Sequence, residues 1–331
     1  MLQEVTTQPP TPLQRLIRLL TTEKRDILYV YLYAIIAGLI SLSLPLGVQA
    51  VFNFVSSGMV FNSIYLLIAL VIIGVVLNGL LTIGQMSLVE VLQQRIFVKA
   101  AFEFTYRLPR IKDEALEGSY PPELMNRFFD VLTVQKGLPK LLIDITAAVL
   151  QIIFGVILLS FYHPFFIVFG LLTFLCVAVM VAILGRRGLE TSLKESKYKY
   201  KVVAYLEDLA RDLPEYRKAG NCDIAIGKMD KLVAGYLENR NDHFRVLKRF
   251  FYSTVTFKTF IVGGLLIAGT LLVVERQMTL GQFVAAELVI VLVTGAVEKL
   301  IMSIDTVFDL LTAVEKLGSV TDLPIEETEE A

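Results

Sequence analysis

The sequence has 331 residues, of which 55% are hydrophobic, and its formal net charge is −1. This composition is typical of an integral membrane protein rather than a soluble one. The near-zero charge gives no basis for binding nucleic acid, and two cysteines cannot make a disulfide framework. The cysteines and histidines are too dispersed for a metal site, so none is predicted at Cys176, Cys222, His163 or His243.

The first residues lack the pattern of a signal peptide, so we expect the first span itself to direct insertion. Thr11 followed by Pro12 predicts a helix N-cap and a first helical residue. The turns that follow place Leu13, Ile17 and Leu20 near one face of a short helix. We therefore expect residues 1–26 to form a cytoplasmic tail and an elbow helix lying in the membrane interface.

Two stretches are nearly free of charge. Residues 27–89 contain no Asp, Glu, Lys, Arg or His, and residues 145–185 contain only His163. Each is about twice the ~20 residues that one span needs. Turn residues at 53–58 and at His163-Pro164 divide each stretch into a hairpin. A third pair at 259–274 and 280–304 completes six predicted transmembrane helices, and Pro45 predicts a kink in the first.

The basic residues predict the orientation. Of the 31 Lys and Arg residues, only Arg276 lies in the three short turns at one side of the membrane. Because cytoplasmic loops carry the excess of basic residues, both termini and both long connections should be cytoplasmic. We therefore expect a multi-pass membrane protein.

The long connections predict helices that extend far beyond the bilayer. Residues 62–108 contain no proline and become amphipathic after Val89, so one helix there would be about 70 Å long. Further long helices are expected from Pro121 to Tyr162, from Pro164 to about Pro214, and from a cap at Asp223 to Val274. Two short segments, 112–120 and 214–222, join them. These helices form a predicted stalk on which another component docks.

The last helix has one polar stripe, made of Glu287, Thr294, Glu298, Asp305 and Asp309, within roughly a 60° arc. Ionisable side chains in a bilayer usually face a bundle interior or a watery cavity. Glu287, Thr294 and Glu298 are therefore candidates for a translocation pathway. We expect Asp305 and Asp309 to lie in cytoplasm and to pair with Lys or Arg of the stalk, and Lys258 and Asp144 to be boundary or salt-bridge residues.

Six sequence segments, taken in order, resemble those of the transmembrane domain of ABC exporters of the six-helix, long-stalk type. The likeness is closest to bacterial exporters of peptides or proteins, which implies a bacterial inner membrane. The segments are residues 43–53, Arg107-Leu108-Pro109, 122–127, 215–221, 279–283 and 313–324. Two departures are Pro122, where the family usually has Gly, and Asn53, where it often has Asp.

The resemblance implies an all-α integral membrane fold of the type 1 exporter kind over residues 27–318, with residues 319–331 as an acidic C-terminal segment. It also implies two coupling segments that contact ATP-binding domains. The residues expected to make these contacts are Glu117, Gly118, Tyr120 and Glu123 in the first segment, and Glu215, Tyr216, Lys218 and Asn221 in the second. A homodimer, or a pair with a related transmembrane subunit, would form the pathway.

No P-loop occurs in the sequence; the nearest string, from Gly220 to Met229, has the wrong spacing and lacks the Ser or Thr that binds magnesium. ATP and Mg²⁺ are therefore expected on a partner or on a part of the protein outside these residues, and no catalytic residue is predicted. The alternative is a membrane scaffold or regulator that keeps the fold without a motor. A secondary transporter is disfavoured, because such proteins usually break their helices at mid-membrane. An intramembrane enzyme lacks any catalytic constellation in the spans.

Overall fold

The computed structural model describes residues 10–58, 62–116, 121–218 and 221–326, with only the backbone for residues 121–123 and 221. Within these ranges the chain is helical apart from its turns and one isolated bridge between Ile111 and Ile325. The α-helices, in chain order, are α1 (Pro12–Thr21), α2 (Lys24–Ser41), α3 (Ser43–Ser56), α4 (Asn62–Arg107), α5 (Asp113–Leu116), α6 (Pro121–Asn126), α7 (Asp130–Pro139), α8 (Thr146–Tyr162), α9 (Phe165–Arg211), α10 (Leu213–Tyr216), α11 (Asn221–Val274), α12 (Leu280–Met302) and α13 (Ile304–Thr321).

Six helical stretches of the described chain are long and apolar enough to cross a membrane, which confirms the predicted number of spans. They are Lys24–Ser56, Asn62–Arg110, Leu124–Tyr162, Phe165–Arg211, Cys222–Val274 and Leu280–Thr321. Helices α4, α9 and α11 have 46, 47 and 54 residues. At 1.5 Å per residue each is roughly 70–80 Å long, more than twice the thickness of the hydrocarbon core.

Local sequence explains where several helices begin and bend. Thr11 caps α1 in a capping box with Gln14, as its position predicted. The first span breaks between α2 and α3 at Leu42. Pro45 has no N–H for the carbonyl of Ser41 four residues earlier, so the predicted kink is confirmed.

Two expectations about helix boundaries were wrong. The third span is not one regular helix: a 3₁₀ turn at Arg127–Phe129 and a π-helical stretch at Lys140–Ile145 separate α6, α7 and α8. Pro139, directly before the π-helical stretch, has no N–H to donate to the carbonyl of Gln135. This missing bond explains why the helix widens from α to π geometry there. Asp223 does not cap α11, since the helix already begins at Asn221. Asp223 lies in the first turn, where a negative charge interacts favourably with the helix dipole.

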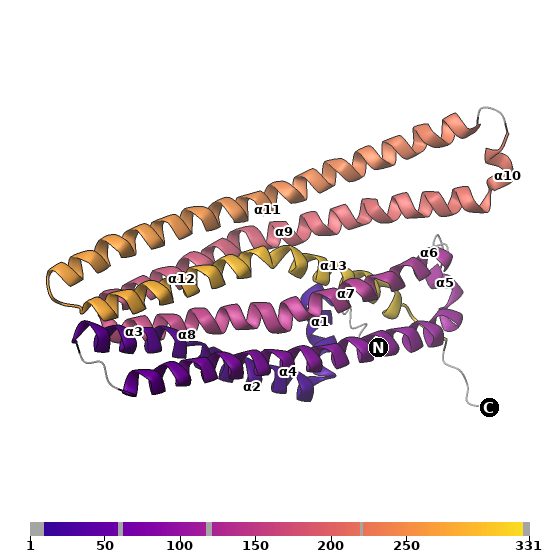
Figure 1. Ribbon diagram of the computed structural model, residues 1–331. Coiled ribbons are helices and arrows are strands. Elements are labelled where there is room, and N and C mark those ends of the chain that lie inside the picture. The colour runs from indigo at the N-terminus through magenta and orange to yellow at the C-terminus, as the bar shows by residue number, and fades with distance from the viewer. Residues whose placement is uncertain (1–9, 59–61, 117–120, 219–220, 327–331) are drawn as a thin grey trace, which may run out of the picture.

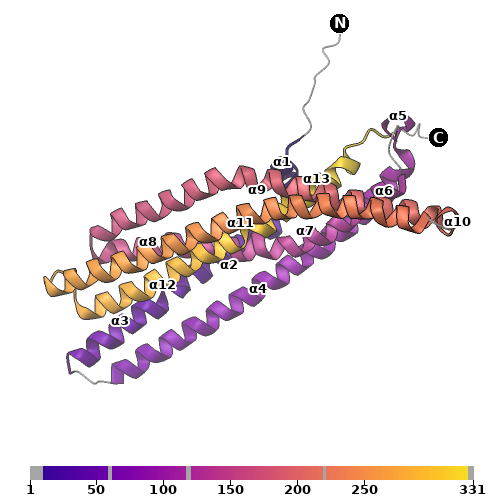
Figure 2. The same cartoon turned by 90° about the horizontal axis from the view of Figure 1, so that it is seen from above.

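The long helices form two stalks that extend toward the same end of the molecule (Figures 1 and 2). The near stalk consists of α7, α13 and the part of α4 after Val89, with α5 and α6 at its tip. The far stalk consists of α9 after Gly185 and α11 before Lys258, with α10 at its tip. Apolar side chains of α1, α2, α4, α7 and α13 pack together at the base of the near stalk.

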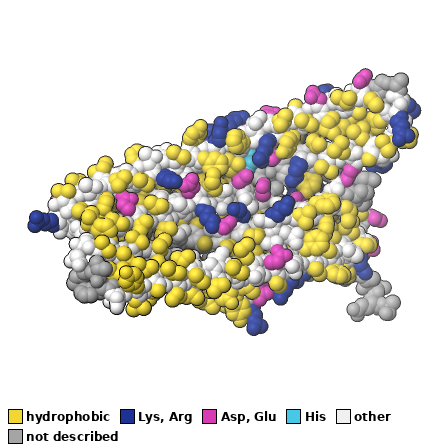
Figure 3. Space-filling view, viewed as in Figure 1, with side chains coloured by type: hydrophobic (Ala, Val, Ile, Leu, Met, Phe, Trp, Pro, Cys, Tyr) yellow, Lys and Arg dark blue, Asp and Glu magenta, His cyan; other side chains and the backbone are white. Residues whose placement is uncertain are grey.

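The membrane end has its own core. Buried side chains of α8, α9, α11, α12 and the first part of α13 make one apolar cluster there. In the space-filling view apolar side chains dominate the membrane end, whereas most charged side chains gather over the middle of the molecule and along the stalks (Figure 3). This distribution is the one expected when one end lies in lipid and the other in water.

Candidate functional site

The first predicted coupling segment lies at the tip of the near stalk. Glu117, Gly118 and Tyr120 lie outside the described residues, and Glu123 is described only as part of the backbone of α6. The segment is anchored beside them. The Asn126 amide donates to Glu207 of α9, and Arg127 donates to the Ser319 hydroxyl of α13 at 2.6 Å.

The end of the described chain returns to the same place. The backbone N–H of Lys112 donates to the carbonyl of Pro324 at 3.1 Å, and that of Glu326 donates to the carbonyl of Arg110 at 2.7 Å. Ile111 and Ile325 lie between these two bonds as an antiparallel bridge. The segment after α13 is thus fixed against the chain that enters the first coupling segment.

The second predicted coupling segment forms the tip of the far stalk. Glu215 and Tyr216 belong to α10, and Lys218, which follows it, makes an ion pair with Glu215. Glu215 and Lys218 are exposed and Tyr216 is half-buried. Asn221 is the first residue of α11, and the thiol of Cys222 beside it donates to the carbonyl of Tyr216 at 3.3 Å. The helical tip therefore presents an acid, a base and an aromatic ring together.

A buried polar cluster joins the far stalk to α13. His243 of α11 is 1% exposed; its Nδ1 lies 2.8 Å from the Thr191 hydroxyl of α9, and its Nε2 lies 3.1 Å from an oxygen of Asp305. Ser192, the next residue of α9, shares a hydrogen bond of 2.9 Å with the Thr312 hydroxyl of α13. Gly188 permits this close approach, because a Cβ there would lie 2.3 Å from the Phe308 ring.

A second polar contact lies further along the stalks, away from the apolar end of the molecule. The Tyr200 hydroxyl of α9 donates to Asp130 of α7. Burial raises the pKa of Asp130. Burial and the hydrogen bond to the Asp130 carboxylate both raise the pKa of Tyr200. Together with Asn126 and Glu207, these residues connect the two stalks through hydrogen bonds rather than through an apolar cluster.

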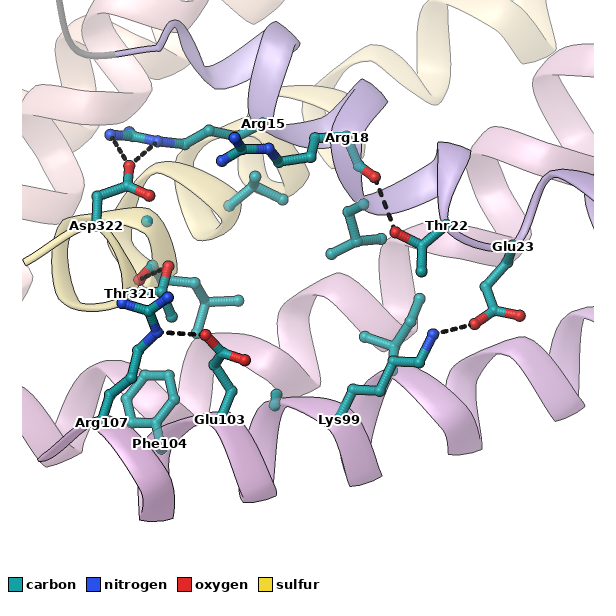
Figure 4. A pocket seen from close by; sticks show the side chains of 16 residues that line it. Arg15, Arg18, Thr22, Glu23, Lys99, Glu103, Phe104, Arg107, Thr321 and Asp322 are labelled. Atoms are coloured by element: carbon teal, nitrogen blue, oxygen red, sulfur yellow. Dashed lines mark hydrogen bonds and ion pairs between the residues drawn. The ribbon is translucent and has the colours of Figure 1, made fainter. Parts of the chain in front are cut away.

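The elbow helix α1 is fixed to the near stalk by charged contacts around a cavity of about 330 Å³ (Figure 4). Arg15 donates to Asp322 at 2.8 and 3.0 Å and also contacts Glu315. Gly318 leaves room for this side chain, since a Cβ would lie 2.4 Å from the arginine Nε. At the other side of the cavity Lys99 of α4 pairs with Glu23. The elbow helix is therefore held against α13, and the residue before α2 is held against α4.

The predicted pathway residues occupy three different environments on α12. Thr294 is 3% exposed, and its hydroxyl donates to the carbonyl of Ile290 at 2.8 Å. Glu298 pairs with Lys258 of α11 at 2.7 Å. One carboxylate oxygen of Glu287 is buried and has no hydrogen-bond partner among the described residues. The structure of one chain therefore brings Glu298 to a basic partner and leaves Glu287 with an unsatisfied oxygen.

The ends of the spans that face the stalks carry the other expected ion pairs. Asp144 contacts Lys299 at 2.8 Å and Lys140 at 3.1 Å. Asp305, for which we expected Lys or Arg, instead contacts a histidine. No group of three or more potential metal ligands occurs in the part of the chain that the structure describes.

Sequence reasoning missed the contacts of His243, for which it predicted only that no metal site is present. One signal was present: Asp305 and Asp309 lie four residues apart on one helical face and required a partner. The Tyr200–Asp130 contact had no such signal, because tyrosine and aspartate are common on stalk surfaces.

Comparison with known proteins supports one assignment. The family described as ABC transporter transmembrane region matches residues 27–211. These residues include the first four spans, the near-stalk part of α4 and α7, and α9 to its end. A search of curated proteins gave no match.

Proposed function

The chain belongs to the family of ABC transporter transmembrane regions, and from that premise we propose that it forms half of the translocation pathway of an ATP-driven exporter. It is a multi-pass transmembrane part of an ABC transporter. The proposal adds export as the direction, ATP-binding domains as the motor, and a second transmembrane subunit, identical or related, as the other half. ATP and Mg²⁺ would bind to the motor, and the membrane would be a bacterial inner membrane with both termini cytoplasmic.

One observation carries the proposal: both stalks end in short helical turns at the same end of the molecule (Figure 1), far from the apolar end (Figure 3). Long rigid helices convert a movement at their tips into a rotation of the spans, which is a common form of alternating access. A motor that binds α5–α6 and α10 would therefore move the spans without touching the membrane.

The proposed contacts of the motor are the two coupling segments. In the second segment Glu215, Tyr216 and Lys218 offer charged and aromatic contacts in a small exposed area. In the first segment the proposed residues are Glu117, Gly118, Tyr120 and Glu123. Asn221 would complete the second segment at the start of α11.

The proposed pathway uses the polar residues of α12. One carboxylate oxygen of Glu287 has no hydrogen-bond partner among the residues that the structure describes, and a buried ionisable group in a membrane is a candidate for contact with cargo or with a second subunit. Glu287 and Glu298 would favour cationic or polar cargo. Thr294 would contribute by shaping the helix face, since its hydroxyl is already bonded within the helix.

The position of Cys222 allows a direct test of the motor contact. Replacing Cys176 by Ser leaves Cys222 as the only thiol of the chain, and Cys222 is exposed beside α10. A short reagent that joins a thiol to a lysine should cross-link Cys222 to an ATP-binding domain, in another polypeptide or elsewhere in the same one. Mass spectrometry of the cross-linked peptides identifies the partner.

A matched control places the thiol on the shaft of the stalk. The variant Cys176→Ser, Cys222→Ser, Glu238→Cys carries an exposed thiol about 24 Å along α11 from the tip. It should give no cross-link to an ATP-binding domain. The proposal is wrong if Cys222 also gives none, or if a membrane-impermeant maleimide labels Cys222 from outside intact cells. The first of these outcomes would favour a scaffold without a motor.

A further inference from the structure

A groove in the membrane half of the molecule runs between α9 and α11. It is lined by residues 172–184 of α9 and 249–261 of α11 and has a volume of about 930 Å³. This is near the upper end of the roughly 300–1,000 Å³ that small-molecule sites enclose. Many of its apolar lining residues are highly exposed, for example Leu175 at 60% and Phe260 at 76%. The groove opens toward the surroundings rather than into the core.

The chemistry of the groove changes along α11 in a fixed order. Arg249 lies at its cytoplasmic end, and the hydroxyl-bearing side chains of Tyr252, Ser253 and Thr256 line it next. Phe257 and Phe260 follow, at about 12–16 Å from Arg249 along the helix axis. A cation, a row of hydroxyl groups and an apolar wall correspond to the phosphate, the glycerol esters and the acyl chains of a phospholipid.

The opposite wall supports the same order. The apolar part of α9 ends at Gly185, and Arg186 and Arg187 follow it directly. Thr191 and His243 are in contact, so α9 and α11 run antiparallel with Arg187 about level with Leu247. The two arginines therefore lie within about one helical turn of Arg249, at the depth of the lipid headgroups.

The guanidinium groups at this end are available for a ligand. Arg186 has a weak contact with Glu190 at 3.5 Å, with both side chains exposed. In the described part of the chain, Arg187 and Arg249 make no side-chain hydrogen bond or ion pair, and both are exposed. Basic pockets between transmembrane helices on the cytoplasmic side are suited to anionic headgroups.

We propose that the groove between α9 and α11 binds an anionic phospholipid of the cytoplasmic leaflet, with its phosphate at Arg187 and Arg249 and an acyl chain along Phe257, Phe260 and Leu175. The charge of the entrance selects the headgroup, and the hydroxyl groups of Tyr252, Ser253 and Thr256 face the ester region. The site would hold the lipid where the far stalk enters the bilayer. This inference requires the membrane orientation given above but not the motor or the direction of transport.

The absence of tryptophan from the 331 residues allows a clean fluorescence test. The variant Phe257→Trp places a single reporter in the groove. The variant Ile83→Trp places one on the exposed face of α4, seven residues from Glu90 and thus at a similar depth. Each variant is reconstituted in vesicles with brominated phosphatidylglycerol or brominated phosphatidylcholine of identical chains, and quenching gives the relative affinity for the two lipids.

The groove reporter should show a preference for phosphatidylglycerol of about five-fold or more, on the basis of about five-fold for each basic residue near an anionic headgroup. The reporter on α4 should show a preference near one. Adding Arg187→Gln and Arg249→Gln to Phe257→Trp should reduce the groove preference to that of the α4 reporter. Leu175→Trp, on the other wall, is a second reporter if Phe257→Trp does not fold.

Three results would overturn the proposal. Equal quenching by both lipids in the groove would show that it is ordinary lipid-facing surface. No quenching by either lipid there, with normal quenching at position 83, would show that protein, such as a second copy of the chain, fills the groove. A preference that survives loss of both arginines would show that they do not bind the headgroup.

Discussion

The near stalk and the far stalk are similar in length and direction but are held together by different interactions. Leu92, Val131, Val134 and Leu138, from α4 and α7, are at most 1% exposed, and they pack with α13 in one apolar cluster. On the far stalk, Ile224, Ile226 and Leu237 are 51–68% exposed. Near the membrane end it packs Val246, Leu247 and Phe250 against α13 in the apolar cluster of that end. Further toward its tip, its connections to the rest of the molecule are the polar contacts at His243, Tyr200 and Glu207.

This difference determines which stalk can move. Burying an apolar side chain contributes about 1.5–3 kcal/mol, and a hydrogen bond to a charged group contributes a similar amount. The near stalk buries many apolar side chains, whereas the outer part of the far stalk makes few such hydrogen bonds, and water can replace each of them. Separating the helices of the near stalk would expose its whole cluster. The part of the far stalk between His243 and its tip can exchange a few hydrogen bonds for water, so we expect this part to move when the tip is moved.

The largest expected effect comes from truncating one leucine in each stalk. Leu138→Ala removes a side chain that is 0% exposed and should lower the free energy of unfolding by about 2–5 kcal/mol. Leu237→Ala, at 51% exposure, should change it by no more than about 0.5 kcal/mol. Denaturant titration in detergent, followed by circular dichroism, measures both. Equal losses for the two variants would contradict the distinction between the stalks.

A smaller effect is expected from Tyr200→Phe. The variant leaves the Asp130 carboxylate buried without its donor and should lower the free energy of unfolding by about 1–3 kcal/mol. Burial has already raised the pKa of Asp130, and loss of the hydroxyl should raise it further. A raised pKa means that the folded state binds the proton more tightly than the unfolded state, so this contribution to stability falls as pH rises.

The loss in Tyr200→Phe should therefore be largest near neutral pH and should shrink on acidification. Thermal melts of the variant and the parent protein at pH 5 and pH 8 measure the difference. Asp130→Asn combined with Tyr200→Phe is the control, because an amide does not ionise there and the pH dependence should disappear. A loss that is the same at both pH values would show that the contact acts through packing alone.

The smallest effect on stability is expected for an ion pair where the far stalk joins the membrane end of the molecule. Lys258 and Glu298 form an ion pair with side chains 49% and 44% exposed. Exposed pairs contribute about 0–1 kcal/mol. Lys258→Gln, Glu298→Gln and the double variant should give a coupling energy in that range from thermal melts. A larger value would mean that the pair is shielded from solvent in the assembled protein.

The number of spans could be predicted from sequence because it depends on local composition. The charge-free stretches, the kink at Pro45 and the cap at Thr11 each involve residues close together in the chain. The irregular third span was missed, since the position of a π stretch depends on how neighbouring helices pack around Pro139.

The contacts between stalks could not be predicted for a different reason. Their members are far apart in sequence: His243 and Asp305 are separated by 62 residues, and Tyr200 and Asp130 by 70. The polar stripe showed that Asp305 faces one side of its helix but not which helix lies there. The roles of the coupling residues and of Glu287 depend on partners and remain predictions.

The bridge between Ile111 and Ile325 has a consequence for anything joined to the chain after Glu326. Such a tether would start beside the first coupling segment, so a short one would keep its load at high effective concentration over α5 and α6. The attached domain would move with the near stalk. Its distance from the tip of the far stalk would then change when the far stalk moves. A fluorescent protein attached there would report the far stalk's excursions as changes in its distance from a label on Cys222.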